Sequence, residues 1–264
     1  MHIDLTGHTA LVTGSTSGIG RAIATALARA GAGVVVNGRD GKRTEEAAAA
    51  IREETGNPGV RGVAADVATQ EGADAIVAAE PEVDILVNNT GVFGPMPVFE
   101  VPDAEWRRYF EVNVLSGVRM ARAYVPRMVD KGWGRVIFIS SDSAMLPPTE
   151  MVHYGITKTA QLAVSRGMAQ SVAGTGVTIN SVLAGPTLTE GVRQFIGELY
   201  GEDVPFEEAE RRFMAEDRPT SLLRRLIRPE EIANLVVYVS SDHASATTGA
   251  ALRSDGGLIP TLIP

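Results

Sequence analysis

Tyr154 and Lys158 stand four residues apart, in an apolar segment that continues to Val164. If this segment is helical, a spacing of four places both side chains on one face, one above the other. A phenol loses its proton near pH ~10 in water, but an ammonium within about 4–6 Å lowers that pKa. The tyrosine could then serve as a general acid or base near neutral pH. The same spacing occurs by chance on exposed helices, so catalysis also requires a cofactor and a third polar group.

Composition limits the chemistry that is available to this pair. The chain has 264 residues, 44% of them hydrophobic, no cysteine and a net charge of −8. This length suits one large core, so we expect a single domain over 1–264. The acidic balance argues against nucleic acid and anionic membranes as partners, because both require a basic face. The four histidines show no metal-ligand spacing, and we expect no metal: His2, His8, His153 and His243.

The N-terminus carries no targeting signal. Residues 1–5 lack the basic and apolar regions of a signal peptide. No apolar run reaches the ~20 residues that span a bilayer. We therefore expect a soluble protein of the cytoplasm with no membrane partner.

A glycine-rich turn separates a predicted strand at 9–13 from an alanine-rich helix at 21–30, with the spacing G-x-x-x-G-x-G. Glycines let the backbone approach a pyrophosphate, and a helix N-terminus offers unpaired N–H groups and a favourable dipole. This context predicts a phosphate cradle, and a tight turn without a ligand is the alternative. The candidate cofactor-binding residues here are Gly14, Ser15, Thr16, Ser17, Gly18, Ile19 and Gly20.

The tip of the second predicted strand, 33–37, bears on the choice of cofactor. In dinucleotide-binding folds an acidic residue at this point usually binds the ribose 2′-hydroxyl, whereas an arginine accommodates a 2′-phosphate. Here Asn37 and Arg39 form the tip, and Asp40 comes one place later. We therefore predict NADP(H) in preference to NAD(H). The alternative is that Arg39 is a solvated charge and Asp40 reaches back to the ribose.

Polar or glycine-containing segments follow the predicted strands 60–65, 83–87, 134–139 and 176–183. In open α/β sheets, ligands bind at these carboxyl ends of strands. Simple turns could also explain some of them. The candidate site residues after these strands are, in order, Asp66 and Val67, then Asn89, Thr90 and Gly91, then Ser141, and finally Gly185, Thr187 and Thr189.

Helical and strand patterns alternate over the whole chain. Helices are predicted at 41–56 and 70–79, from Asp103 to Tyr124 or beyond, and around the Tyr-Lys pair, and a last strand at 250–253. This order predicts an α/β fold, a single doubly wound, Rossmann-type parallel sheet of about seven strands with helices on both faces. Asn113 lies inside the long helix, where its own context favours a structural role.

Residues 190–228 interrupt this alternation with a mixture of aromatic and charged residues. An insertion of this length at a strand tip is often a substrate lid. A helical pair that thickens the edge of the domain is the alternative. The apolar residues that could line a substrate pocket, or belong to the core instead, are Met145, Leu146, Met151, Val152 and Phe195.

With these residues assembled, the sequence resembles the short-chain dehydrogenase/reductase family from Gly7 to Gly257. The motifs that carry the resemblance are Thr13-Gly14 through Gly18-Ile19-Gly20, Asp66-Val67, Asn88-Asn89-Thr90-Gly91, Asn113, Ser141, Tyr154 with Lys158, Gly185-Pro186-Thr187 and Asp255-Gly256-Gly257.

The resemblance implies a role for each catalytic residue. Tyr154 would be the general acid in carbonyl reduction and the base in alcohol oxidation. Lys158 would bind the nicotinamide ribose and lower the pKa of Tyr154. Ser141 would hydrogen-bond the substrate oxygen, and Asn113 would hold a water in a proton relay.

The activity implied is an NADP(H)-dependent oxidoreductase that transfers hydride between nicotinamide and a ketone or secondary alcohol. A 3-oxoacyl thioester reductase is one form of it, and Arg193, Arg211 and Arg212 could then meet an acyl carrier, although nearby acids dilute this patch. An NAD-dependent alcohol dehydrogenase of the same family is the alternative. A non-catalytic dinucleotide sensor is a further one, but such proteins commonly lose the tyrosine or the lysine.

Family members typically form homotetramers, or else homodimers, through helices corresponding to 103–129 and 154–173 and the C-terminal strand. Three positions depart from the family pattern. Thr90 replaces a usual alanine, and Ala184 stands where proline is common. Ser17 is not the basic residue of many NADP-preferring members, so the NADP(H) prediction rests on Arg39.

Overall fold

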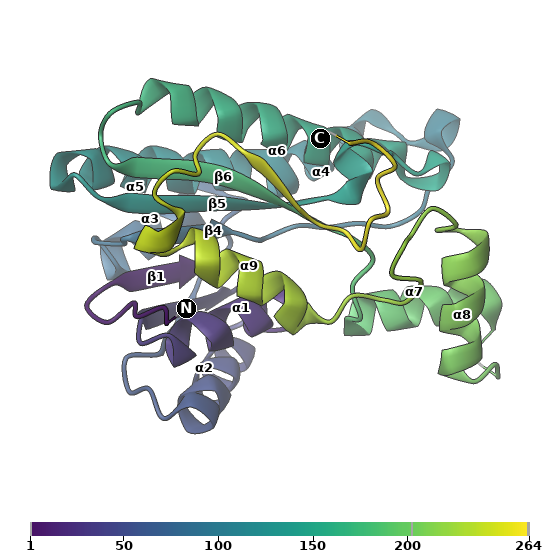
Figure 1. Cartoon of the computed structure of the whole chain (residues 1–264), viewed down its shortest axis with the longest axis horizontal. Helices are drawn as coiled ribbons and strands as arrows, with labels where there is room; N and C mark the ends of the chain where they lie inside the picture. The colour runs from purple at the N-terminus through teal and green to yellow at the C-terminus, as the bar shows by residue number, and fades with distance from the viewer. Residues whose placement is uncertain (1, 202, 263–264) are drawn as a thin grey trace.

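The computed structural model of the chain describes residues 2–201 and 203–262. The predicted single domain over 1–264 therefore includes four residues, 1, 202, 263 and 264, that lie outside the described range. All strand pairs are parallel and form one seven-stranded sheet in the order β3-β2-β1-β4-β5-β6-β7 (Figure 1). The strands are β1 (Thr9–Val12), β2 (Gly33–Gly38), β3 (Arg61–Ala64), β4 (Ile85–Asn88), β5 (Gly134–Ser141), β6 (Val177–Ala184) and β7 (Ala251–Ser254).

Helices cover both faces of the sheet. Figure 1 shows α6 above the strands and α1 and α2 below them. The two apolar cores place α1, α2 and α9 on one face of the sheet and α3, α5 and α6 on the other. The predicted doubly wound architecture is therefore confirmed. The helices are α1 (Gly18–Arg29), α2 (Gly41–Thr55), α3 (Gln70–Ala79), α4 (Asp103–Phe110), α5 (Ser116–Lys131), α6 (Val152–Ser171), α7 (Glu190–Tyr200), α8 (Phe206–Glu216) and α9 (Pro229–Val239).

The central strands are apolar on both faces because each face meets a layer of helices. Side chains alternate along β1, so that Ala10 and Val12 join the core beneath α1, α2 and α9. Leu11 points to the opposite core, which contains Ile76 of α3 and Met120 of α5. The burial of these two cores fixes the register of the sheet, since a shift by one residue would exchange the two faces.

The strand order reverses at β1, which lies between β2 and β4. Helices before and after this point run on opposite faces, so a crevice opens beyond the carboxyl ends of β1 and β4. The hydroxyl of Thr13, just after β1, accepts hydrogen bonds from the backbone N–H groups of Asn89 and Thr90, just after β4. The fold therefore joins the glycine-rich turn to the Asn-Asn-Thr-Gly segment at the crevice.

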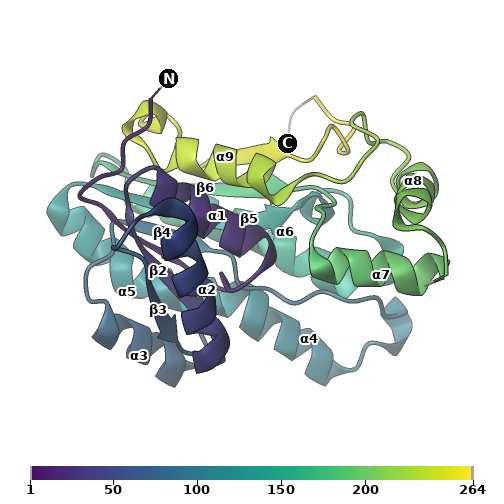
Figure 2. The ribbon, with the colours of Figure 1, turned by 90° about the horizontal axis from the view of Figure 1, so that it is seen from below.

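Helices α7 and α8 stand apart from the two main layers (Figure 2). Thr189 caps the first turn of α7 by accepting a hydrogen bond from the Val192 N–H. The two helices pack around their own apolar cluster, which includes Ile196 and Phe213. Residues 190–228 are thus folded around a helical pair with a separate small core, and the prediction that they form a lid stays a prediction.

The described residues contain neither a membrane-spanning helix nor a group of metal-ligating side chains. Within residues 2–201 and 203–262 no helix is long and apolar enough to cross a membrane. In the same residues no three His, Asp or Glu side chains are grouped so that they could hold a metal ion.

Candidate active site

Two adjoining cavities occupy the crevice at the carboxyl ends of the strands. The first, about 380 Å³, is lined by Ser141, Tyr154 and Lys158. The second, about 750 Å³, is lined by Arg39 and Asp66. Both cavities share four wall residues and therefore form one continuous site: Ser17, Asn89, Gly91 and Val92.

The glycine-rich turn between the two cavities has no room for side chains. Gly14 and Gly18 have φ of +61° and +57°, which L side chains rarely adopt. A Cβ on Gly20 would lie 2.5 Å from the Gly14 carbonyl oxygen and closer still to the Asn89 amide. No side chain caps the N-terminus of α1, so the first N–H groups of this helix stay available to an anion. These features fit the pyrophosphate of a dinucleotide.

At the tip of β2 the second cavity is lined by two arginines and by one acid, Asp40, whose carboxylate already accepts a hydrogen bond. Asp40 caps α2 by accepting a hydrogen bond from the Arg43 N–H at 2.8 Å. The Asn37 amide donates to the carbonyl oxygens of Val63 and Ala65, both at 3.1 Å. Arg39 and Arg43 both line this cavity, and neither side chain makes an ion pair within residues 2–201 and 203–262.

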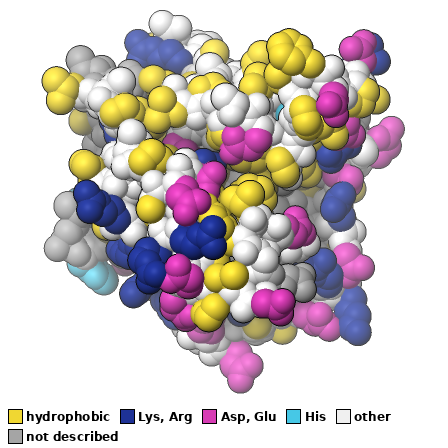
Figure 3. Space-filling model, turned by 90° about the vertical axis from the view of Figure 1, so that its right-hand side faces the viewer, with side chains coloured by type: hydrophobic (Ala, Val, Ile, Leu, Met, Phe, Trp, Pro, Cys, Tyr) yellow, Lys and Arg dark blue, Asp and Glu magenta, His cyan; other side chains and the backbone are white. Residues whose placement is uncertain are grey.

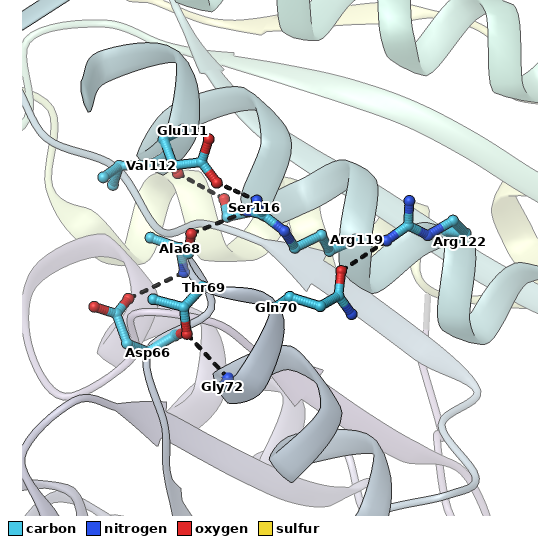
Figure 4. A network of polar contacts seen from close by, with 10 residues as sticks. All are labelled: Asp66, Ala68, Thr69, Gln70, Gly72, Glu111, Val112, Ser116, Arg119 and Arg122. Carbon is cyan, nitrogen blue, oxygen red and sulfur yellow. Dashed lines mark hydrogen bonds and ion pairs between the residues drawn. The ribbon is translucent and has the colours of Figure 1, made fainter. Parts of the chain in front are cut away.

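Side chains of α5 help to hold the loop that carries Asp66 and Val67. Arg119 of α5 donates to the Ala68 carbonyl oxygen at 3.0 Å and pairs with Glu111, as Figure 4 shows. Arg122 donates to the Gln70 side chain at 2.9 Å. This part of the wall of the second cavity is therefore held by α5, which directly follows the turn that contains Asn113.

Thr90, which departs from the family pattern, lines the second cavity. Its hydroxyl oxygen is buried and has no hydrogen-bond partner among the described residues. A buried hydroxyl without a partner costs free energy, and a polar group of a ligand would remove that cost. This orphaned hydroxyl is a second observation that fits a bound dinucleotide.

Tyr154 and Lys158 lie on α6 and both reach the first cavity, as their spacing predicted. The Lys158 ammonium lies 5.6 Å from the centre of the Tyr154 ring. It donates to the Ile139 carbonyl oxygen at 2.9 Å and to the Gln161 side chain at 3.2 Å. Burial lowers the pKa of Lys158 to about 8.

The protonation of Tyr154 differs from the expectation drawn from its lysine neighbour. Burial raises the pKa of Tyr154 above its usual value, the hydroxyl of Ser141 lowers it, and the negative charge of Asp142 raises it. Desolvation is the largest of these effects. The ammonium of Lys158 donates to Ile139 and Gln161 and makes no hydrogen bond to the phenol. Tyr154 is therefore a protonated phenol at neutral pH, which is the form of a general acid.

Ser141 ends β5 at the wall of the first cavity. Its hydroxyl accepts a hydrogen bond from the Ser143 N–H at 3.1 Å and donates to the Asp142 carboxylate at 2.8 Å. Asp142 is itself buried and lines the same cavity. The strand thus delivers a hydroxyl and a carboxylate, side by side, next to the phenol of Tyr154.

Asn113 does not line either cavity. The predicted continuous helix from Asp103 is interrupted at Glu111–Leu115 by a π-helical turn, which contains Asn113. Its amide donates to the Val92 carbonyl oxygen at 3.0 Å and accepts from the Val92 N–H at 2.8 Å. Its backbone carbonyl accepts from Gln161 at 2.6 Å. Gln161 therefore links Asn113 directly to Lys158.

The structure gathers almost all predicted site residues into the two cavities. Ser15 and Asn113 are the exceptions, since the Ser15 hydroxyl is buried and donates to the Val12 carbonyl oxygen at 2.6 Å. Of the five apolar residues predicted to line a substrate pocket or join the core, Met151 and Phe195 line the first cavity. The remaining predicted residues on the cavity walls are Gly14, Thr16, Ser17, Gly18, Ile19, Gly20, Asn37, Arg39, Asp66, Val67, Asn89, Thr90, Gly91, Ser141, Tyr154, Lys158, Gly185, Thr187 and Thr189.

Sequence reasoning missed three polar residues. Asp142 could have been noticed because it follows Ser141 directly. Gln161 lies one helical turn beyond Lys158, so the same spacing argument could have placed it beside the ammonium. Arg218 reaches the first cavity from the segment after α8, and no local pattern signals that long-range contact.

Comparisons with known proteins agree with this geometry. Residues 14–259 match the family model described as enoyl-(acyl carrier protein) reductase. The uncharacterized oxidoreductase YvaG of Bacillus subtilis is 52% identical over 98% of this chain and 98% of its own length. A D-beta-hydroxybutyrate dehydrogenase of Cupriavidus necator is 34% identical over 97% of this chain and 99% of its own.

Among solved structures, L-sorbose reductase of Gluconobacter frateurii in complex with NADPH and L-sorbose superposes with a TM-score of 0.91. It is 35% identical, and the match covers 99% of this chain and 100% of that one. The two relatives are thus an oxidoreductase and a dehydrogenase, and the solved structure is a reductase with bound NADPH. The phosphate cradle, the Tyr-Lys helix and these full-length matches together show that the chain belongs to the short-chain dehydrogenase/reductase family and is an NAD(P)-dependent oxidoreductase.

Proposed function

We propose that the protein is an NADP(H)-dependent enzyme that interconverts a ketone and a secondary alcohol. One observation carries the proposal: Ser141, Tyr154 and Lys158 meet at one cavity wall, and this cavity continues into the dinucleotide cradle. When bound, the nicotinamide supplies or accepts the hydride.

The chain's own residues bind and orient the reactants and move the proton. Tyr154 donates its phenolic proton to the carbonyl oxygen during reduction, and burial keeps that proton in place at neutral pH. Ser141 fixes the position of the same oxygen by donating a hydrogen bond to it, for which its hydroxyl turns from Asp142 toward the substrate. Lys158 holds the nicotinamide ribose, and Gln161 and the Ile139 carbonyl oxygen orient its ammonium.

Substitution of the phenol tests this function. Tyr154→Phe keeps the ring but removes the proton donor, and we expect ketone reduction to slow by about 10²–10⁴-fold. Turnover is measured as the loss of NADPH absorbance over a panel of ketones, and NADPH affinity is measured in parallel by fluorescence titration. Retention of wild-type turnover in the variant would contradict the assignment of Tyr154.

The preference for NADP(H) is supported by the groups at the tip of β2. Arg39 lines the second cavity, and Asp40 is engaged as a helix cap, so a 2′-phosphate meets an arginine there and no unengaged carboxylate. We expect NADPH to bind at least about tenfold tighter than NADH, a difference of about 1.4 kcal/mol.

Parallel fluorescence titrations of wild type and Arg39→Ala measure this difference. The variant is expected to lose most of the gap between the two cofactors. Equal affinities of wild type for NADPH and NADH, unchanged in the variant, would instead favour the NAD-dependent alternative.

A 3-oxoacyl thioester on an acyl carrier is not favoured by the local charges. Arg212 pairs with Glu216 at 3.4 Å, and Arg211 pairs with Glu208. Arg193 lies over the ring of Phe206, 3.7 Å from its centre. Figure 3 shows the end of the molecule that carries α7 and α8, where acidic and basic side chains are interspersed and form no single basic patch. An acidic carrier therefore has little to bind there.

We also propose that the α7–α8 region is a substrate lid. Phe195 of α7 and Phe213 of α8 line the first cavity, and both belong to the separate small core of this region. A unit with its own core can move as one body over the cavity. Slower amide hydrogen exchange in α7 after addition of NADPH and substrate would support this role, and unchanged exchange would contradict it.

A homotetramer is the assembly that we propose, with a homodimer as the simpler form. Large apolar side chains are exposed on the helices that the family uses for assembly. Phe110, Leu115 and Ile156 are 36%, 39% and 46% exposed. Burial of such side chains between copies would stabilise an assembly. Light scattering of the purified protein gives the mass, and a monomer would refute this proposal.

A further inference from the structure

Asp142 is a buried carboxylate in the substrate half of the site. It is 6% exposed and forms the first residue of a short helical turn after β5. Its carboxylate accepts one side-chain hydrogen bond, from Ser141 at 2.8 Å. No lysine or arginine within residues 2–201 and 203–262 comes within ion-pair distance of it. Asp142 therefore has capacity to accept a hydrogen bond that the protein itself leaves unused.

Burial of a carboxylate is costly unless it is paired or fully hydrogen-bonded. Burial raises the pKa of Asp142 to about 6. The hydroxyl of Ser141, the charge of Arg218 and the backbone N–H of Ser143 lower this pKa, and the charge of Asp255 raises it. Arg218 does not satisfy this carboxylate. Its guanidinium donates to the Asp217 carbonyl oxygen at 2.8 Å and lies 3.6 Å from Glu150. A donor on the substrate would fill the role that no side chain fills.

The rest of the cavity restricts the kind of donor. Its other wall is largely apolar and includes Val192, Phe195 and Phe213. Its charged wall residues are the acids Asp142 and Glu190 and two cations, Lys158 and Arg218. The proposed function assigns Lys158 to the cofactor ribose, and Arg218 already faces Glu150, so neither cation is left for an anionic group of the substrate. This balance disfavours a carboxylate or phosphate on the substrate. An uncharged hydroxyl group supplies the donor without a second charge.

The position of Asp142 sets where that hydroxyl must lie. The hydroxyl of Ser141, which orients the reacting oxygen in the proposed function, is hydrogen-bonded to one carboxylate oxygen of Asp142 at 2.8 Å, which leaves the second carboxylate oxygen for the substrate. Oxygens on neighbouring carbons of a substrate are adjacent in the same way, so one can face each side chain. We propose that Asp142 accepts a hydrogen bond from a hydroxyl on the carbon next to the carbonyl, and that the enzyme therefore selects uncharged α-hydroxyketones. This inference rests on the proposed oxidoreductase function.

Three ketones of matched shape test it. In 3-pentanone, 1-hydroxy-2-butanone and 1,3-dihydroxyacetone, methyl groups are replaced one at a time by hydroxyls. We expect kcat/KM of the wild type with NADPH to rise along this series, and 4-oxopentanoate, which carries a carboxylate, to be the poorest substrate. One hydrogen bond to a charged group corresponds to about 10–100-fold. An α-hydroxyl also activates the carbonyl chemically, so the series alone is not decisive.

The Asp142→Asn variant separates recognition from reactivity. Its amide oxygen can still accept the bond from Ser141, but its NH₂ group cannot accept one from the substrate. The ratio of kcat/KM for 1-hydroxy-2-butanone to that for 3-pentanone cancels any loss of general activity. We expect this ratio to fall at least tenfold in Asp142→Asn. Glu207→Gln, which removes an exposed acid of α8 that lines neither cavity, is expected to keep the wild-type ratio.

Binding provides a readout that needs no turnover and no variant. The wild type with saturating NADP⁺ should be stabilised against heat by 1,2-butanediol at lower concentrations than by 3-pentanol. Tighter binding of 3-pentanol than of 1,2-butanediol would overturn the inference. The same holds if the ratio of kcat/KM for 1-hydroxy-2-butanone to that for 3-pentanone is equal in wild type and Asp142→Asn. If none of the ketones is reduced, the proposed function fails, and the relative binding of the two alcohols to wild type and Asp142→Asn still decides whether Asp142 recognises a hydroxyl.

Discussion

The two halves of the crevice are built on different principles. The cofactor half, from β1 to β3, is shaped by backbone geometry, with glycines at positive φ and side chains such as Asn37 fully engaged with backbone groups. The substrate half, from β5 to α8, carries buried ionisable groups with few partners, including Asp142 and Lys158. The backbone thus makes the shape of the phosphate cradle. Substrate selectivity and proton transfer depend instead on side chains that remain available to a substrate.

The largest effect should come from filling the glycine turn. Gly20→Ala places a methyl 2.5 Å from the Gly14 carbonyl oxygen, so the turn must open. We expect NADPH affinity to fall by more than about tenfold and stability by about 1–3 kcal/mol. Fluorescence titration and thermal unfolding measure the two losses.

Gly167→Ala is the matched control, because a Cβ on this helical glycine has nothing within 4 Å. It should bind NADPH as the wild type does and gain about 0.5–1 kcal/mol of stability. If both variants bound NADPH like the wild type, the tight packing of Gly20 against the Gly14 carbonyl would not be needed for cofactor binding.

The next largest effect should come from Gln161, whose side chain links Lys158 to the Asn113 carbonyl. Gln161→Leu removes one of the two acceptors of the Lys158 ammonium, which keeps the Ile139 carbonyl oxygen, and it removes the side-chain donor to the Asn113 carbonyl. We expect a loss of about 1–3 kcal/mol in stability and about tenfold in kcat through misplacement of Lys158. Chemical denaturation and steady-state kinetics measure both.

Two further variants sharpen the interpretation of Gln161. Gln161→Glu keeps an acceptor for Lys158 and should retain more of the kcat than the leucine variant. Gln194→Leu changes an exposed glutamine of α7 and should stay within about 0.5 kcal/mol of the wild type. A Gln161→Leu enzyme with unchanged kcat and unchanged pH profile would mean that Lys158 needs no such support.

The smallest effect concerns pH. Because burial raises the pKa of Tyr154, the phenol stays protonated at neutral pH and reduction should vary little with pH there. Alcohol oxidation needs the phenolate, whose fraction grows as pH approaches the pKa from below, so its rate should still rise between about pH 7 and 9. Asp142→Asn removes a negative charge that raises this pKa, and should move the rise to lower pH. An oxidation rate that levels off below pH 7 would contradict the raised pKa.

The sequence predicted the cofactor half better than the substrate half for physical reasons. Strand and helix patterns and the glycine spacing are local, so the parallel sheet and the phosphate cradle follow from neighbouring residues. Arg218 lies more than 50 residues after Tyr154 and Lys158 in the sequence and lines the same cavity. This contact depends on how α8 packs, so the sequence alone could not reveal it. The raised pKa of Tyr154 was also hidden, because burial is a property of the whole fold.

Asn113 shows the limit of both kinds of reasoning. Its context favoured a structural role, and the family resemblance implied a water-binding one. The structure shows the side chain bonded to the backbone of Val92 and the carbonyl bonded to Gln161. A π-helical turn creates this arrangement, and hydrophobic periodicity alone does not distinguish such a turn from a regular helix.

Isotope transfer tests the central claim most directly. The wild-type enzyme is incubated with NADPH deuterated at either face of nicotinamide C4 and with 1-hydroxy-2-butanone or 3-pentanone, and the products are analysed by mass spectrometry. The account predicts that one of the two labels appears on the carbinol carbon, one deuterium for each NADPH consumed. NADPH that binds but transfers deuterium to no ketone would contradict it and would leave a dinucleotide-binding protein without hydride transfer.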